Sequence, residues 1–263
     1  MECVVLVALS RDSDTAEILE RIPGDGIFAQ NLYEEGEVLY LALENLQNGK
    51  QSGTRLFVYN LRDKKMKELQ PLPWRRQDAA MTLYREAFYR VDGFSLMRYD
   101  IKTGEEKEVF SGVMGNGENL PIEDGYLGLL DGEKNEILRF NMAENRLEDR
   151  IAVGSRVTEI QVSGKYAIWT EAGGERYLYQ LDTQTLASLA EVSEWLSAVK
   201  EYEIFLQGDR LYAISENEIA VFDLAERTRQ QMELRNGNRR AYRAGEKEGL
   251  VLLDDEAEVI YLF

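Results

Sequence analysis

The chain has 263 residues, with 31 Lys and Arg against 48 Asp and Glu, no His and one Cys, so its formal net charge is −17. This sign argues against nucleic acid as a partner, because phosphates bind to basic surfaces. The absence of His removes the commonest general base and the commonest zinc ligand, and a single Cys excludes a disulfide framework. Hydrophobic residues make up 44% of the chain, which is enough for a sizeable folded core.

The chain begins with an apolar run, from Cys3 to Leu9. A signal peptide needs positive charge before such a run and small residues after it, whereas Glu2 precedes this run and Arg11 follows it. We therefore expect a core strand, in which Cys3 is buried. A complete chain of this kind is expected to be cytoplasmic, and a chain from which a leader was trimmed is expected to be extracytoplasmic. No apolar run reaches the ~18 residues needed to span a bilayer.

Five segments share one pattern, an alternating apolar run that reaches an Asn or Asp near its end. They are LFVYNL (56–61), LMRYDI (96–101), ILRFNM (137–142), LYQLDT (178–183) and IAVFDL (219–224). The anchors Asn60, Asp100, Asn141, Asp182 and Asp223 follow one another at steps of 40, 41, 41 and 41 residues, and a further step of 40 reaches Phe263. Period-two alternation predicts strands, and apolar residues on both strand faces predict sheets that are covered on both sides.

Each anchor strand is expected to be the third of four strands. The strands predicted before the anchors are Val38–Leu43, Ala87–Val91, Tyr126–Leu130, Tyr166–Thr170, Leu211–Ser215 and Leu250–Leu253, each preceded by an inner strand. Outer strands such as Glu105–Phe110 and Arg146–Val153 follow a tight turn, in which the anchor side chain accepts backbone N–H groups. Gly104 and Asn145 are expected in the left-handed conformation, at a place that Lys64, Leu186 and Arg227 occupy in the other repeats.

Four short strands per ~40 residues describe a propeller blade. The sequence thus predicts an all-β fold, a six-bladed β-propeller with four-stranded blades, in a single domain that spans residues 1–263. The last period stops at its third strand, so an N-terminal strand is expected to join the C-terminal blade and close the ring. The candidates are Glu2–Leu9 and Thr15–Ile22, which a hairpin through Ser10–Asp14 would pair. The position of the second candidate assumes a long loop at Glu44–Gly53. If both strands join one blade, its outer edge becomes a surface for self-association.

The run LMRYDIKTG (96–104) and its relatives in the chain resemble bacterial six-bladed β-propellers of the broad TolB-like kind. The pattern differs from WD40 repeats, in which this strand ends in Trp-Asp, and from quinoprotein propellers, which usually have eight blades and more Trp. The resemblance implies a scaffold for binding proteins, peptides or wall components. Some relatives are enzymes, so the fold alone does not decide the activity.

Propeller function usually gathers at the channel mouth, where a connection enters each inner strand. These connections lie about 15 residues after each anchor, and they carry repeated Arg and two of the three Trp residues. The predicted ligand-binding residues are Trp74, Arg75, Arg76, Asn119, Arg156, Trp195, Arg239 and Arg240. Arg pairs with carboxylate or phosphate and Trp offers a flat stacking face. The leading hypothesis is a non-enzymatic module that captures a protein, peptide or small anionic ligand without a cofactor.

Two alternatives stay open. In the first, the arginines neutralise acids such as Glu118 and Glu201, and the Trp side chains fill gaps between blades. In the second, the chain is a channel-centred hydrolase that resembles the six-bladed calcium-dependent lactonases. Its cation would need oxygen ligands, for which the candidates are Asn31, Asn119, Glu159 and Glu201. The acidic run Asp12-Ser13-Asp14 lacks the Gly and the later Glu of a calcium loop, and is interpreted as a turn.

Overall fold

The computed structural model describes residues 3–9, 16–23, 27–47, 50–73, 81–114, 122–123, 125–131, 133–186, 195, 203–215, 218–233, 239–243, 250–254 and 260–262. Every element named within these ranges is a β-strand, and neighbouring strands pair in the antiparallel direction. The predicted all-β class is therefore confirmed. Within the same ranges, no helix combines the length and the apolar character that a membrane crossing requires.

Contacts between Cα atoms divide the chain into two compact units. The first unit comprises Met1–Ala79, Leu83–Phe88 and Tyr99–Glu106, and the second comprises Ala80–Thr82, Tyr89–Arg98 and Lys107–Phe263. A single domain that spans residues 1–263 stays a prediction.

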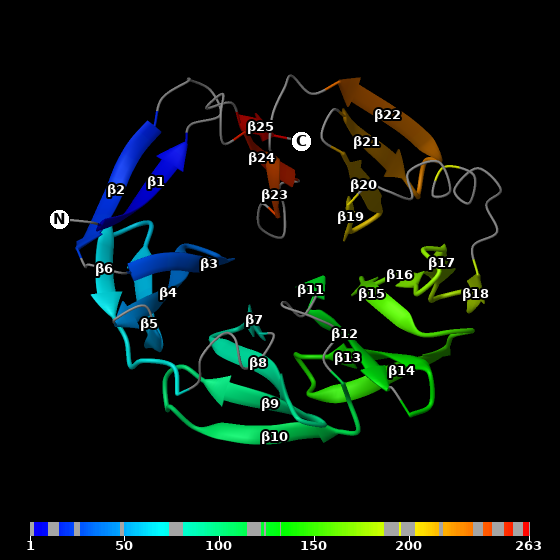
Figure 1. The fold of residues 1–263 in the computed structure, drawn as a ribbon, viewed down its shortest axis with the longest axis horizontal. Coiled ribbons are helices and arrows are strands. Elements are labelled where there is room, and N and C mark those ends of the chain that lie inside the picture. Colours follow the sequence, from blue (N-terminus) through cyan, green and yellow to red (C-terminus); the bar gives the residue numbers. More distant parts are fainter. Residues whose placement is uncertain are drawn as a thin grey trace. The chain divides into compact units, whose positions relative to one another are not determined.

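The first unit contains a hairpin and a four-stranded sheet. The hairpin pairs β1 (Cys3–Leu9) with β2 (Ala16–Pro23), and the sheet contains β3 (Ile27–Glu35), β4 (Val38–Gln47), β5 (Lys50–Asn60) and β6 (Lys65–Glu68) in sequence order (Figure 1). Leu6 and Ile22 of the hairpin are buried in one hydrophobic cluster with Leu41 and Phe57 of the sheet. The predicted pairing of the two N-terminal strands is confirmed, and closure of a ring by them stays a prediction.

The next sheet is divided between the two units. It contains β7 (Met81–Tyr84), β8 (Ala87–Asp92), β9 (Ser95–Asp100) and β10 (Glu106–Ser111), again paired in sequence order.

The rest of the second unit repeats this topology. The strands of two sheets are β11 (Ile122–Glu123), β12 (Tyr126–Asp131), β13 (Glu136–Asn141) and β14 (Arg146–Ala152), then β15 (Val157–Val162), β16 (Tyr166–Glu171), β17 (Arg176–Gln180) and β18 (Thr185–Leu186). The strands of the last two are β19 (Glu203–Gln207), β20 (Arg210–Ile214), β21 (Glu218–Asp223) and β22 (Thr228–Glu233), then β23 (Arg239–Arg243), β24 (Leu250–Asp254) and β25 (Ile260–Leu262). The predicted strands before each anchor are thus confirmed to within a few residues.

Several middle strands of the described sheets carry runs of residues that are buried on both faces. Four consecutive residues of β13, from Ile137 to Phe140, are buried, and β8 and β20 show similar runs. The outer strands β6 and β10 carry no buried residue, and β6 is mostly exposed. Hydrophobic clusters fill the space between successive sheets, for example between Ile137 of one sheet and Ile160 and Trp169 of the next. This confirms the prediction that both faces of the sheets are covered.

The segment predicted as a long loop, Glu44–Gly53, is mostly strand. β4 continues to Gln47 and β5 begins at Lys50, so the two strands form a long hairpin with a register shift between Asn45 and Leu46. The prediction was wrong because polar residues in an extended hairpin lack the apolar alternation that was used to find strands.

The anchor residues close tight turns, as predicted. Oδ1 of Asn60 accepts the N–H groups of Arg62 and Asp63, each at 2.9 Å, and Oδ1 of Asp100 accepts two N–H groups at 3.0 Å. Four residues after the anchors Asn60, Asp100, Asn141 and Asp223 the backbone is left-handed, for example with φ of 50° at Lys64 and 72° at Gly104. The side chain thus satisfies backbone donors that a four-residue hairpin turn leaves without partners.

The fourth repeat departs from the predicted register. β17 ends at Gln180 rather than at Asp182, and the left-handed residue is Gln184 rather than Leu186. Gln180 therefore occupies the anchor position, because it pairs with Thr185 across the turn as Asn60 pairs with Lys65. The sequence pattern required Asn or Asp at the anchor position, so it pointed to Asp182 instead of Gln180, two residues earlier.

Candidate functional site: the connection end of the sheets

Backbone hydrogen bonds join successive sheets of the second unit at one end of their strands. The N–H of Val153 donates to the carbonyl of Asn135 at 3.0 Å, and the N–H of Ala172 donates to the carbonyl of Arg156 at 2.8 Å. The connection at residues 153–156 is thus tied to the turn between the second and third strands of the sheet on either side of it. We call this region, residues 93–94, 112–114, 133–135, 153–156 and 172–175, the connection end.

One of the predicted binding residues lies exposed at this end. Arg156 is exposed, lies directly before β15, and forms no ion pair with any residue that the structure describes. Arg239 and Arg240 begin β23, where their backbones pair with Asp254 and Leu253. The other four predicted residues on the connections, Trp74, Arg75, Arg76 and Asn119, lie outside the described residues.

Trp195 is a packing residue. Its side chain is only 6% exposed, and its ring lies 5.7 Å from that of Phe222. It belongs to a hydrophobic cluster with Ile204 and Leu211. This position corresponds to the alternative in which Trp side chains fill gaps, because a buried indole offers no open face to a ligand.

Two cations of the sheet that precedes the connection at residues 153–156 neutralise nearby acids. Arg150 lies 2.8 Å from Glu136 and 3.6 Å from Asp131, and Lys134 lies 3.3 Å from Asp131. Burial raises the pKa of Asp131, but the N–H and ammonium groups of Lys134 outweigh it, and the pKa is lowered overall. These two cations are paired with acids, whereas Arg156 remains available to an external anion.

The backbone next to Arg156 is held in place by a carboxylate. Ser155 Oγ donates to Glu171 Oε2 at 2.5 Å, and this hydrogen bond lowers the pKa of Glu171. The carboxylate stays ionised at neutral pH and ties the connection to β16. Arg156 is consequently presented from a fixed loop, which reduces the entropy lost when a ligand binds.

Two exposed apolar side chains at the same end were missed by the sequence analysis. Phe94 is 65% exposed and Met114 is 43% exposed. The carbonyl of Phe94 accepts the N–H groups of Gly112 and Val113, at 2.8 and 3.0 Å, so the turn and the connection lie together. The sequence did contain a signal for Phe94. It follows Gly93 in a two-residue turn, and the second position of such a turn does not require an apolar side chain.

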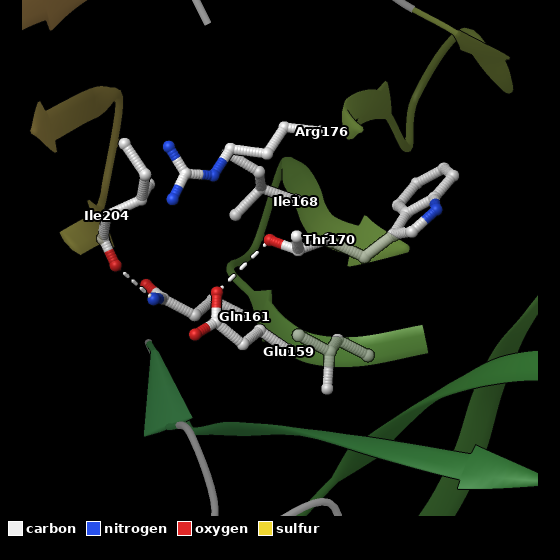
Figure 2. A pocket seen from close by; sticks show the side chains of 8 residues that line it. Glu159, Gln161, Ile168, Thr170, Arg176 and Ile204 are labelled. Carbon is white, nitrogen blue, oxygen red and sulfur yellow. Dashed lines mark hydrogen bonds between the residues drawn. The ribbon is translucent and has the colours of Figure 1, made fainter. Parts of the chain in front are cut away.

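A small hollow lies between the sheet of β15–β18 and β19, again in the second unit (Figure 2). Its floor is Ile168 and Ile204. Gln161 spans it by donating to the carbonyl of Ile204 at 2.5 Å and accepting the N–H of Leu206 at 2.6 Å. The hollow has room for about one water molecule. It is therefore a packing seam between sheets and not a ligand site.

The calcium-dependent alternative gains no support from the residues that the structure describes. Glu159 lines the hollow and accepts the hydroxyl of Thr170 at 3.1 Å. Glu201 and Asn119 lie outside the described residues, as does the side chain of Asn31. Among the described side chains, no three acidic, His or Cys groups gather closely enough to hold a metal ion.

No protein-family model matches the chain, and no curated protein matches it significantly in sequence.

Proposed function

We propose that the chain is a non-enzymatic binding module, built as a six-bladed β-propeller of the TolB-like kind, that captures an anionic ligand at the connection end of its sheets. The fold part of this proposal is supported by the ~40-residue repeat and by successive sheets that each pair their strands in sequence order. In such a propeller the connection ends of all blades surround the mouth of one channel.

The observation that carries the binding part is the exposure of Arg156. It is an arginine without an ion pair to any described residue, in a chain whose net charge is −17, on a connection that hydrogen bonds hold in place. An unpaired guanidinium on a fixed loop is suited to bidentate binding of a carboxylate or phosphate. The proposal places Arg75, Arg76, Arg239 and Arg240 around the same mouth, at the same phase of the repeat.

The partner class that fits best is a protein or peptide with acidic side chains. Phe94 and Met114 add exposed apolar area at the connection end, and aromatic and Met side chains are enriched in protein interfaces. A small sugar acid would use the arginines but not this apolar area.

The proposal is tested with two anionic probes, a hexaglutamate peptide and a trigalacturonate, whose binding is measured by calorimetry. Arg156→Ala is expected to weaken binding about fivefold or more, through loss of a charge-assisted hydrogen bond. The variant with Arg75, Arg76, Arg239 and Arg240 changed to Ala is expected to abolish binding. The matched control is Arg150→Ala, which removes an arginine that is already paired with acids and should leave binding unchanged.

The proposal fails if Arg156→Ala and Arg150→Ala bind both probes as tightly as the unchanged protein. Failure of the fourfold variant to fold would make those arginines structural, and Arg156→Ala would then decide alone. Calorimetric titration with Ca²⁺ covers the enzymatic alternative, since tight calcium binding together with lactone hydrolysis would contradict a non-enzymatic module.

A further inference from the structure

We propose that the free edge of β6 is a second docking site, which pairs with an acidic, extended segment of a partner protein. β6 is the last strand of its sheet, and no described strand pairs with its outer side. The N–H of Leu69 donates to the carbonyl of Leu56 at 2.8 Å. Because N–H groups alternate in direction along an antiparallel strand, those of Lys67 and Lys65 point toward β5, and those of Glu68 and Met66 point outward. A partner strand would find donors at these two positions.

The charge around this edge is opposite to that of the chain. Residues 55–68 contain five cations and two acids, in a chain with a net charge of −17. One of the acids, Glu68, is held by Arg55. The side chains of Lys65 and Lys67 are exposed and form no ion pair with any described residue. At physiological salt, screening limits charge interactions to about 8 Å, so these lysines attract an acidic segment despite the acidity of the whole molecule.

Side-chain contacts fasten this edge to the rest of the first unit. Arg55 Nε and Nη2 lie 2.7 and 2.8 Å from the two carboxylate oxygens of Glu68, which fastens the end of β6 to β5. The guanidinium of Arg55 also lies over the ring of Phe57, 4.8 Å from its centre. Met66 packs against the hydrophobic cluster of the first unit. A strand held this way loses little conformational entropy when another strand pairs with it.

Other outer strands do not share this charge. β10 carries two acids and one lysine, and β14 carries two acids and two arginines. Charged residues on an edge strand discourage pairing between identical chains, and acids serve that purpose on β10. The lysines of β6 keep away other basic edges, but they favour an acidic strand.

The side chains of β6 alternate between the two faces of its sheet, and this alternation determines which partner sequence can pair with it. Lys65 and Lys67 are two residues apart and therefore lie on one face of the strand, while Met66 lies on the other. Opposite charges directly across two strands stabilise their pairing. The expected partner therefore alternates Glu with β-branched residues such as Val or Thr, so that the Glu side chains face the lysines.

The proposal is tested by fluorescence polarisation with a labelled, terminally blocked peptide of sequence Thr-Glu-Val-Glu-Val-Thr. The unchanged protein should bind it, and the variant Lys65→Glu with Lys67→Glu should bind about tenfold more weakly or not at all. The matched control is Lys107→Glu with Arg229→Glu, which makes the same change of charge on the outer strands β10 and β22. This control should bind the peptide normally.

A second probe separates strand pairing from simple charge attraction. It is the same peptide with N-methyl groups on alternate residues, which keeps the charge but removes backbone donors. It should bind about tenfold more weakly than the first peptide. Equal binding of both peptides would overturn the proposal, as would no detectable binding of either, or binding of anionic lipid vesicles in place of the peptide.

Two further outcomes distinguish this site from others. A dimer of the unchanged protein that the β6 variant loses would assign the edge to a second copy of the chain and overturn the proposal. The β6 variant should still bind trigalacturonate, which cannot pair with a strand, so failure at β6 leaves the proposed function at the connection end intact.

Discussion

At the scale of single residues, the anchor side chains stabilise the repeat through the turns that they close. Oδ1 of Asp223 accepts the N–H groups of Ala225 and Glu226, at 3.0 and 2.9 Å. Asp223→Ala should lower the free energy of unfolding by about 1–2 kcal/mol, measured by urea denaturation, and Asp223→Asn should recover most of the loss because the acceptor is kept. Asp182→Ala is the matched control and should have almost no effect. An equal loss at Asp182 would contradict the register in which Gln180 is the anchor.

A second residue-scale prediction concerns a strained turn in the first unit. Arg85 and Glu86 have left-handed backbones, with φ of 46° and 56°, in the two-residue turn between β7 and β8. Asn-Gly adopts this turn at lower cost, so Arg85→Asn with Glu86→Gly should stabilise the protein by about 1 kcal/mol, even after the surface ion pair between Glu86 and Lys102 is lost. A lower midpoint in thermal unfolding would show that contacts of these side chains outweigh the strain.

The corresponding turn between β3 and β4 supplies a control in which the substitution should destabilise the protein. Gly36 has a φ of 63°, and an added Cβ would meet no atom within 4 Å. Gly36→Ala should therefore lose about 1 kcal/mol through backbone conformation alone.

At the scale of elements, a close contact between two sheets of the second unit depends on a glycine. A Cβ on Gly128 of β12 would lie 3.1 Å from Cδ1 of Ile160 and 3.2 Å from Cγ1 of Val162, both on β15. Gly128→Ala should destabilise the protein by about 1–3 kcal/mol in urea denaturation, because the core there has no room for another methyl group. Adding Ile160→Val, which removes Cδ1, should recover part of the loss. Strictly additive effects of the two changes would contradict this contact.

The strands differ in how well the sequence predicted them. The apolar runs of the middle strands and their ~40-residue repeat located these strands, because middle strands such as β8, β13 and β20 are buried on both faces and therefore carry apolar residues at nearly every position. The short outer strands and the polar end of the β4–β5 hairpin leave a weak signal, so Glu44–Gly53 was predicted as a loop. Among the anchor turns that the structure describes, the spacing failed where Gln180 replaces Asn or Asp.

The candidate site was harder to predict than the fold. Phase within the repeat placed Arg156 on a connection between sheets, and there it is exposed. Phase alone could not distinguish an exposed aromatic ring from a buried one. Trp195 packs against Phe222, whereas the exposed aromatic residue is Phe94, in a turn that the search for arginines did not consider.

For the whole molecule, the proposed six-bladed propeller predicts one cooperative unfolding transition, because each blade of a closed ring packs between two neighbours. Differential scanning calorimetry should give a single peak whose calorimetric and van 't Hoff enthalpies agree, and tryptophan fluorescence and circular dichroism should change together. Gly36→Ala in the first unit and Gly128→Ala in the second should each shift this one peak to lower temperature. Two peaks, each moved by only one of the variants, would instead show two independently folding units and remove the shared channel mouth on which the proposed function rests.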